Sequence, residues 1–255
     1  MQKLIVALLA GLCLIITACD TGQSSRAEIP TDPQALLEEV VANMQSIDTF
    51  RMTLEQTGAP YPLLLSFDGT SVIQAELRRG TAQFVSPNEL FINVNLRIGV
   101  VVTVDIFSRD DTQWASFPSG APWYQLPPFP DFDISKLMAK GDGMEYAMAN
   151  LENINIIGEE TLIDGTNALH IQADATGEVV RGLLFGLIEP EDDVQVDVYI
   201  NTSDNRFALV EVTMLETTTE DNDERSVWRI EFYDYNAPQD FDAPPQAQAE
   251  ATEEA

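Results

Sequence analysis

The feature that most constrains the fold is the alternation of apolar and polar residues. In residues 89–98 an apolar side chain fills every second position, and the positions between are mostly polar: the apolar set is Leu90, Ile92, Val94, Leu96 and Ile98. A period of two is typical of a β-strand with one buried and one wet face. Similar patterns predict further strands at 51–55, 73–78, 100–107, 112–117, 123–126, 154–162, 168–173, 194–201, 207–216 and 227–235.

Only a few helices are expected among about ten or eleven antiparallel strands. Asp32 and Pro33 form an N-cap and first helical position ahead of an amphipathic helix to about residue 46, and further helical stretches are predicted at 133–140, 144–151 and 178–188. Strands that alternate cleanly have one apolar face that must be shielded from water, and we expect the helices to pack on that face. We therefore predict a single α+β domain, built as one large curved sheet with short helices over its apolar face.

The N-terminus carries a secretion signal. A short start with Lys3 precedes an uncharged apolar run from Leu4 to Ala18, which is too short to span a bilayer readily. The sequence from Ile16 to Cys19 resembles a bacterial lipobox, which implies cleavage before Cys19 and lipidation of that cysteine. We predict a lipoprotein signal peptide at 1–18, a flexible tether at 19–32, a folded domain at 33–238 and a disordered acidic tail at 239–255.

The charge of the chain excludes several partners. With 13 Lys+Arg against 42 Asp+Glu the net charge is −29, and cleavage after residue 18 changes it to 12 − 42 = −30 because Lys3 is lost. Such a protein repels phosphate backbones, so nucleic-acid binding is not expected. Attraction of the protein as a whole to anionic membranes is excluded for the same reason. Any membrane contact must therefore be apolar or covalent.

The residues available for catalysis are few. The one His, His170, alternates with Leu169 and Ile171, so we expect it on the polar side of a strand, at the surface or rim. No Gly-x-Ser-x-Gly turn is present, and lipidation of Cys19 leaves the mature chain without a free thiol. The acidic run at 216–224 lacks the spacing of a calcium loop and is expected to be a solvated hairpin tip. We predict no enzyme activity, no cofactor and no metal site.

Several stretches together resemble the LppX/LprA/LprF/LprG family of bacterial lipoproteins, which is related in fold to the LolA/LolB carriers. They are the lipobox, the helix ending in the residues 44–51 (MQSIDTFR), the residues 80–84 (GTAQF) and 87–90 (PNEL), Trp114 with 123–126 (WYQL), and the closing residues 230–238 (IEFYDYNAP). The resemblance implies an open half-barrel whose helices lie over a hydrophobic cavity for acyl chains. It also implies transport or presentation of lipids or glycolipids in the envelope, on the extracytoplasmic side of a membrane.

The candidate lipid-binding residues are apolar side chains from three helical segments and one strand. They are Leu36, Val40 and Met44; Met144, Met148 and Leu151; Val180, Leu183, Leu184 and Leu187; and Leu90, Ile92, Val94 and Leu96.

The segment 178–188 is either an ordinary buried helix or a mobile apolar lid. The alternative to lipid binding is an envelope-stress sensor or assembly lipoprotein that uses the same fold to bind a protein partner.

Overall fold

The computed structural model describes residues 32–65, 72–110, 112–127, 137–186, 188, 190–216 and 224–245. The chain divides into two units, Met1–Thr31 and Asp32–Ala255, and every described residue lies in the second unit. The predicted signal peptide, Cys19 and most of the predicted tether therefore fall outside the described residues.

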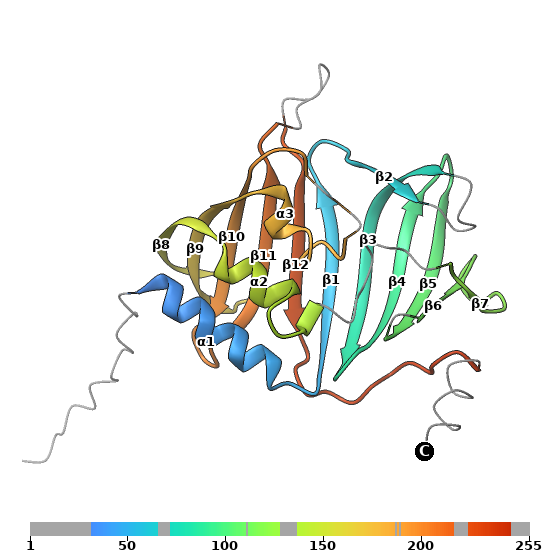
Figure 1. Ribbon diagram of the computed structural model, residues 1–255, viewed down its shortest axis with the longest axis horizontal. Coiled ribbons are helices and arrows are strands. Elements are labelled where there is room, and N and C mark those ends of the chain that lie inside the picture. The colour runs from blue at the N-terminus through green and yellow to red at the C-terminus, as the bar shows by residue number, and fades with distance from the viewer. Residues whose placement is uncertain are drawn as a thin grey trace, which may run out of the picture. The chain divides into compact units, whose positions relative to one another are not determined.

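The core of the fold is an open antiparallel sheet of twelve strands in the order β7-β6-β5-β4-β3-β1-β12-β11-β10-β9-β8, with β2 paired to β3 (Figure 1). The strands are β1 Thr49–Thr57, β2 Pro62–Leu65, β3 Ile73–Val85, β4 Glu89–Arg97, β5 Val101–Arg109, β6 Thr112–Ser116, β7 Tyr124–Gln125, β8 Glu152–Thr161, β9 Asn167–Ala175, β10 Val194–Asn201, β11 Arg206–Met214 and β12 Val227–Tyr233. The α+β class and the single sheet are confirmed. The strand that sequence reasoning missed is the short β2.

Strand β3 is longer than predicted because its alternation changes phase. The pairing with β4 shifts between Leu77 and Arg79, so Ala75 and Leu77 face the core before the shift, and Ala82 and Phe84 face it afterwards. An extra residue in one strand of a pair turns the following side chains to the other face. The period-two pattern therefore ends at residue 78, although the strand continues to Val85.

The first helix, α1 (Pro33–Gln45), forms where it was predicted. The carboxylate of Asp32 accepts hydrogen bonds from the backbone N–H groups of Gln34 and Ala35, at 3.0 and 3.3 Å. Its apolar stripe is fully buried: Leu36, Leu37, Val40, Val41 and Met44. α1 packs against β8, β11 and the short helix α2 (Gly143–Ala149). Half of the predicted helix at 133–140 falls on residues 133–136, which are not described, and residues 137–140 form a short 3-10 turn rather than an α-helix.

The predicted helix at 178–188 is wrong in its extent. Only α3 (Gly177–Val180) is helical, and turns follow it, with positive φ angles of 58° at Phe185 and 66° at Gly186. A Cβ atom built on Gly182 would lie 2.8 Å from the Cα atom of Gly143 in α2. Here glycine allows two backbones to touch, which helical periodicity could not reveal.

The C-terminal segment also differs from the prediction. Residues 239–245, which were assigned to a disordered tail, are described, and the Phe241 ring stacks on Phe91 with 5.1 Å between centroids. Phe241 joins Phe107 and Trp114 in a second apolar cluster, separate from the main core. Arg51 further holds the segment through an ion pair with Asp240 at 2.8 Å. The packed domain therefore extends beyond residue 238; residues 246–255 are not described.

The close contact at Gly182 gives a test of this arrangement. In a regular helix Gly182→Ala would stabilise the protein by about 1 kcal/mol, because alanine is the better helix former. In this fold the added methyl group collides with the backbone of Gly143, so we expect a loss of about 1–3 kcal/mol in the free energy of unfolding, measured in urea.

Gly80→Ala is the matched control for that measurement. A Cβ atom at Gly80 would meet nothing closer than 3.7 Å, which is ordinary contact, so its effect should stay small. A stabilised Gly182→Ala variant would contradict the observed turn.

Candidate functional site

The candidate lipid-binding residues converge on one face of the sheet. Twelve of them are buried members of a single hydrophobic cluster: Leu36, Val40, Met44, Leu90, Val94, Leu96, Met144, Met148, Leu151, Val180, Leu183 and Leu184. Ile92 is partly buried and packs against the same cluster. Cys19 and Leu187 lie outside the described residues. Side chains from four distant parts of the sequence thus meet in one apolar layer.

The helical segments are held to one another at the edge of this layer. The side-chain amide of Gln34 in α1 donates to the backbone carbonyl of Met148 in α2, at 3.3 Å. The Gln45 amide donates to the Glu145 carboxylate at 2.6 Å. The segment after α3 is as buried as the strands, with Leu183 at 1% and Leu184 at 0% exposure, so the suggested lid lies closed on the core.

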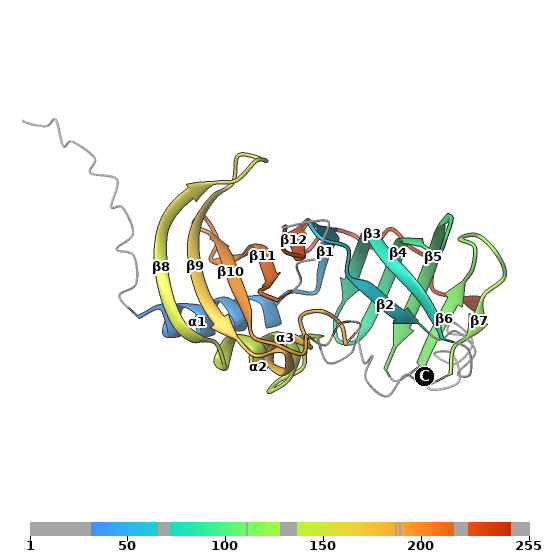
Figure 2. The same ribbon diagram turned by 90° about the horizontal axis from the view of Figure 1, so that it is seen from above.

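The helices lie on one side of the sheet and over only part of it. Figures 1 and 2 show α1, α2 and α3 over the half that contains β8–β12. The apolar face continues onto β3–β5, where its residues pack against the main cluster: Leu77, Ala82, Ile92, Val94, Leu96, Val102, Val104 and Ile106. The described helices lie over one half of this apolar layer, and Leu77, Leu96 and Val104 in the other half are buried as well, at 2, 4 and 0% exposure.

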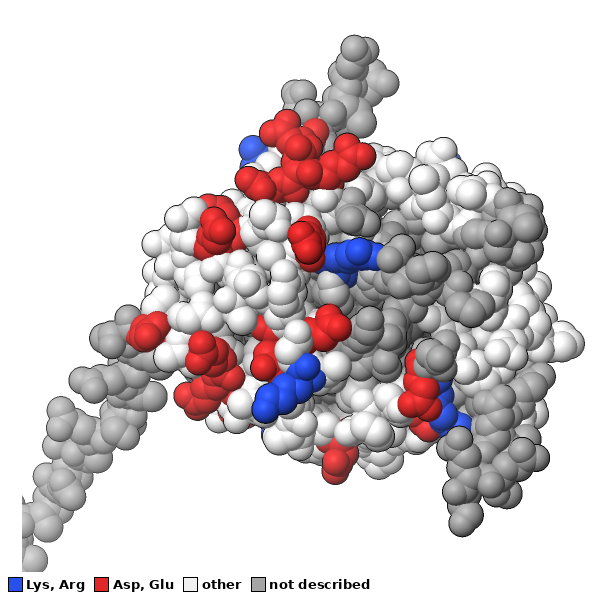
Figure 3. Space-filling model, viewed as in Figure 1, with Lys and Arg blue, Asp and Glu red and all other residues white. Residues whose placement is uncertain are grey.

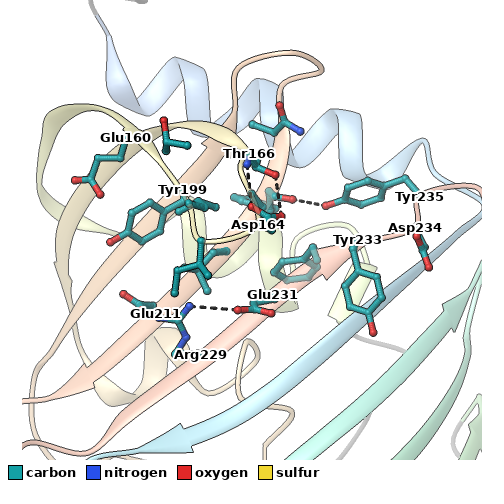
Figure 4. Close-up of a pocket in the computed structure, with 18 residues that line it drawn as sticks. Glu160, Asp164, Thr166, Tyr199, Glu211, Arg229, Glu231, Tyr233, Asp234 and Tyr235 are labelled. Carbon is teal, nitrogen blue, oxygen red and sulfur yellow. Dashed lines mark hydrogen bonds and ion pairs between the residues drawn. The ribbon is translucent and has the colours of Figure 1, made fainter.

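The opposite face carries a groove of about 680 Å³ that sequence reasoning did not find. Its floor includes Tyr199, Glu211 and Arg229, which alternate along their strands with core residues, and its wall is the β8–β9 turn (Figure 4). The Arg229 guanidinium is ion-paired with Glu211 and, at 3.2 Å, with Glu231. The only signal in the sequence was a set of charged and aromatic residues at outward strand positions, which is typical of a solvated face.

Burial governs the titration of the groove floor. It raises the pKa of the Glu211 carboxyl, and the neighbouring Arg229 guanidinium opposes this rise. It also raises the pKa of the Tyr199 hydroxyl, with the nearby Glu211 and Asp197 carboxylates adding to the shift. Tyr199 is therefore neutral at physiological pH, a hydroxyl able to donate or accept a hydrogen bond.

His170 lies on the polar side of β9 as expected, but it is buried rather than exposed at a rim. Its Nδ1 atom is 2.9 Å from Glu160 and its Nε2 atom 2.8 Å from Asp197, while the ring stacks on Tyr199 with 4.3 Å between centroids. The curled β8–β9 hairpin brings Glu160 over the ring, and this covers it. Because each ring nitrogen already faces a carboxylate, neither is available to activate a serine.

The fold has counterparts among known proteins. Residues 32–240 match the LppX_LprAFG lipoprotein family. The chain belongs to this family. It is similar in structure to LprF from Mycobacterium bovis, with a TM-score of 0.56, 12% identity, and coverage of 83% of this chain and 96% of that one. LppX from Mycobacterium tuberculosis gives a TM-score of 0.55 and 13% identity over 83% and 100% of the two chains. No curated protein sequence gave a match.

Two further observations bear on this LppX_LprAFG lipoprotein. Within the described residues, no helix is long and apolar enough to cross a membrane. The same residues contain no group of three or more His, Cys, Asp or Glu side chains placed to hold a metal ion. The acidic run at 216–224 falls mostly on residues 217–223, which are not described.

The raised pKa of Glu211 gives a pH-dependent prediction. The Glu211 carboxyl releases its proton at a higher pH in the folded protein than in the unfolded chain. The free energy of unfolding therefore falls as the pH rises from the unfolded pKa through the folded pKa. Glu211→Gln removes this contribution. In urea unfolding, the stability of the variant relative to the natural protein should therefore increase between pH 4 and pH 7.

The ion pair with Arg229 forms only when Glu211 is ionised, and its effect is already part of the net raised pKa, so it does not reverse this trend. Glu231→Gln, which changes a more exposed carboxylate on the same guanidinium, is the control for loss of a contact with Arg229. A relative stability of Glu211→Gln that falls toward pH 7 would contradict the assignment.

Proposed function

We propose that this lipoprotein binds the acyl chains of a lipid or glycolipid on its helix-covered apolar face, and that it carries or presents that lipid in the cell envelope. We further propose that it is anchored to the extracytoplasmic side of the membrane through lipidated Cys19, and that it is not an enzyme. The observation that carries the proposal is the apolar face itself, which extends beyond the described helices onto β3–β5.

The energetics favour acyl chains as the ligand. Removing apolar surface from water contributes about 25 cal/mol per Å², or about 0.8 kcal/mol per buried CH₂ group, and does not require directional contacts. A face lined by aliphatic side chains from β3–β5 supplies this environment. The methionines of α1 and α2, Met44, Met144 and Met148, suit chains of varied shape because the thioether side chain is flexible and polarisable.

Trp228 offers a polar contact within the same layer. Its ring is fully buried on β12, and the indole Nε1 atom has no hydrogen-bond partner among the described residues. Buried donors are nearly always paired, and an unpaired one costs about 1–3 kcal/mol. An ester or carboxyl oxygen of a bound lipid is an acceptor that would satisfy it.

The anchor and the absence of catalysis have separate support. The lipobox-like sequence before Cys19 and membership of a lipoprotein family support lipidation at that residue. Two acyl chains hold a protein stably on a bilayer. The two carboxylate contacts of His170 argue against a hydrolase based on that residue.

The decisive experiment is native mass spectrometry of the non-acylated mature protein purified from its own host. We expect a protein mass with a bound lipid that organic extraction releases. A protein that carries no lipid, together with an experimental structure showing a solid interior, would overturn the proposal. It would instead favour a sensor or assembly protein with a protein partner.

A pair of substitutions on β4 tests which face binds the acyl chain. Ile92 points inward and is only partly buried, so Ile92→Asp places a carboxylate on the apolar face at a position that tolerates some solvent. We expect binding of dansyl-labelled undecanoic acid, measured by fluorescence, to weaken at least about tenfold because a charge is costly next to hydrocarbon.

Asn95→Asp is the matched control, since it adds the same charge to the same strand on the opposite face. There the Thr103 hydroxyl donates to the Asn95 side-chain oxygen at 2.8 Å, and aspartate keeps that acceptor. Equal loss of probe binding in both variants would contradict binding on the apolar face.

The unpaired indole gives a second test. Trp228→Phe removes the unpaired N–H group, which offsets the cavity left by the smaller ring, so stability should fall by no more than about 1–2 kcal/mol. Probe binding should weaken by roughly fivefold to tenfold, the effect of one hydrogen bond. Unfolding in urea and the fluorescence titration measure the two effects. Unchanged probe binding would show that the indole N–H does not contact the ligand.

A further inference from the structure

Exposed aliphatic side chains gather at one end of the sheet. Five of the large apolar residues that the structure exposes come from the ends of β2, β3 and β5 and the turn before β5, with exposed fractions of 73, 67, 37, 67 and 64%: Leu64, Val72, Ile73, Val100 and Val101. We refer to these five residues as the apolar rim. Isolated exposed aliphatic residues are ordinary, but a contiguous group usually marks an interaction surface.

Strand register brings the members of the rim together. Leu65 pairs with Ile73 at the β2–β3 end, Glu76 of β3 pairs with Arg97 of β4, and Arg97 pairs with Val101 of β5. The start of β3 therefore lies beside the β4–β5 turn. In Figure 1 the corresponding ends of β2, β3, β4 and β5 lie side by side at the upper right.

The described part of the rim carries no net charge in a strongly acidic protein; residues 66–71, which include Asp68, are not described. In the described residues 61–65, 72–77 and 96–102 the only charged side chains are Glu76 and Arg97, which form an ion pair with 3.7 Å between Oε2 and Nη1. The whole chain has 42 acidic residues, and Figure 3 shows acidic side chains mainly over other parts of the visible face. Shallow insertion of these described residues into an apolar phase would therefore bury no unpaired charge.

We propose that the apolar rim inserts into the surface of a lipid bilayer. A stable protein interface takes about 20–30 residues on each side, whereas the rim offers five aliphatic side chains at the ends of three strands. That shape suits shallow insertion among lipids better than docking of a second protein. The net charge excludes electrostatic adsorption, and apolar insertion is the mode of contact that such a charge still allows.

The position of the rim suggests what insertion into a bilayer would serve. The rim lies at the ends of β3–β5, the strands whose apolar face the described helices do not cover. Insertion would bring the ends of these strands next to the bilayer. The predicted tether, residues 19–32, would reach at most about 50 Å if fully extended, enough for a lipid-anchored domain to turn toward its own membrane. Rim insertion itself does not depend on whether the domain holds a lipid.

The test uses the mature chain with Cys19→Ser, which has no acyl anchor and no thiol. Val100→Cys on the rim and Ile163→Cys on the β8–β9 turn, which is 101% exposed, each receive an environment-sensitive fluorophore. With phosphatidylcholine vesicles we expect a blue shift and quenching by bilayer-embedded doxyl lipids at residue 100 and neither at residue 163. Adding anionic phosphatidylglycerol should weaken binding, because the protein carries a large negative charge.

Substitutions without a label complete the test. Leu64→Ser, Val100→Ser and Val101→Ser combined should lower vesicle binding in a flotation assay at least about tenfold, whereas Ile163→Ser should not. The four side chains are exposed, so the fold should be retained. Absence of vesicle binding, equal responses at residues 100 and 163, or a concentration-dependent dimer that the rim substitutions abolish would each overturn the proposal. Native mass spectrometry tests lipid binding, and the vesicle experiments test rim insertion. The two proposals can therefore fail separately.

Discussion

The pairing of β1 with β12 joins the two halves of the molecule, and the rest of the architecture depends on it. Residues 51–57 of β1 pair with residues 227–233 of the last strand, and β1 pairs with β3 on its other side. Aromatic rings follow this junction across four strands: Phe50 lies 5.0 Å from Phe84 and 5.9 Å from Phe232, which lies 5.9 Å from Phe207. Without this junction the two halves would be separate smaller sheets, each with an additional open edge.

The junction also divides the apolar face into two parts with different cover. On the β8–β12 side, α1 and α2 are fixed to each other and to the strands, and Gly143 and Gly182 let the segment after α3 approach closely. On the β3–β5 side the same face continues without a described helix. Both halves contribute buried side chains to one hydrophobic cluster, and they differ in whether a described helix lies over them.

The parts of the fold that sequence predicted well are those in which local chemistry and burial agree. Asp32 and Pro33 set the start of α1, and strict alternation located β4 and the strands of the β10–β12 meander. The errors arose where tertiary contacts override local pattern. Phe185 takes a positive φ because the chain must turn over the core, and Phe241 binds the outer face although its neighbours are typical of a disordered tail.

The same reasoning explains why the candidate apolar residues could be identified but their surroundings could not. Periodicity alone shows which stripe of a helix or which face of a strand is apolar and therefore buried. The members of the main cluster could be recognised in this way. Which faces meet depends on strand order, and the order here places the C-terminal strand beside the first. That order determines that Glu160 covers His170 from the neighbouring strand β8, and that Glu211 lies opposite Arg229. A sheet with another strand order would keep every amphipathic pattern of this sequence and lose both contacts.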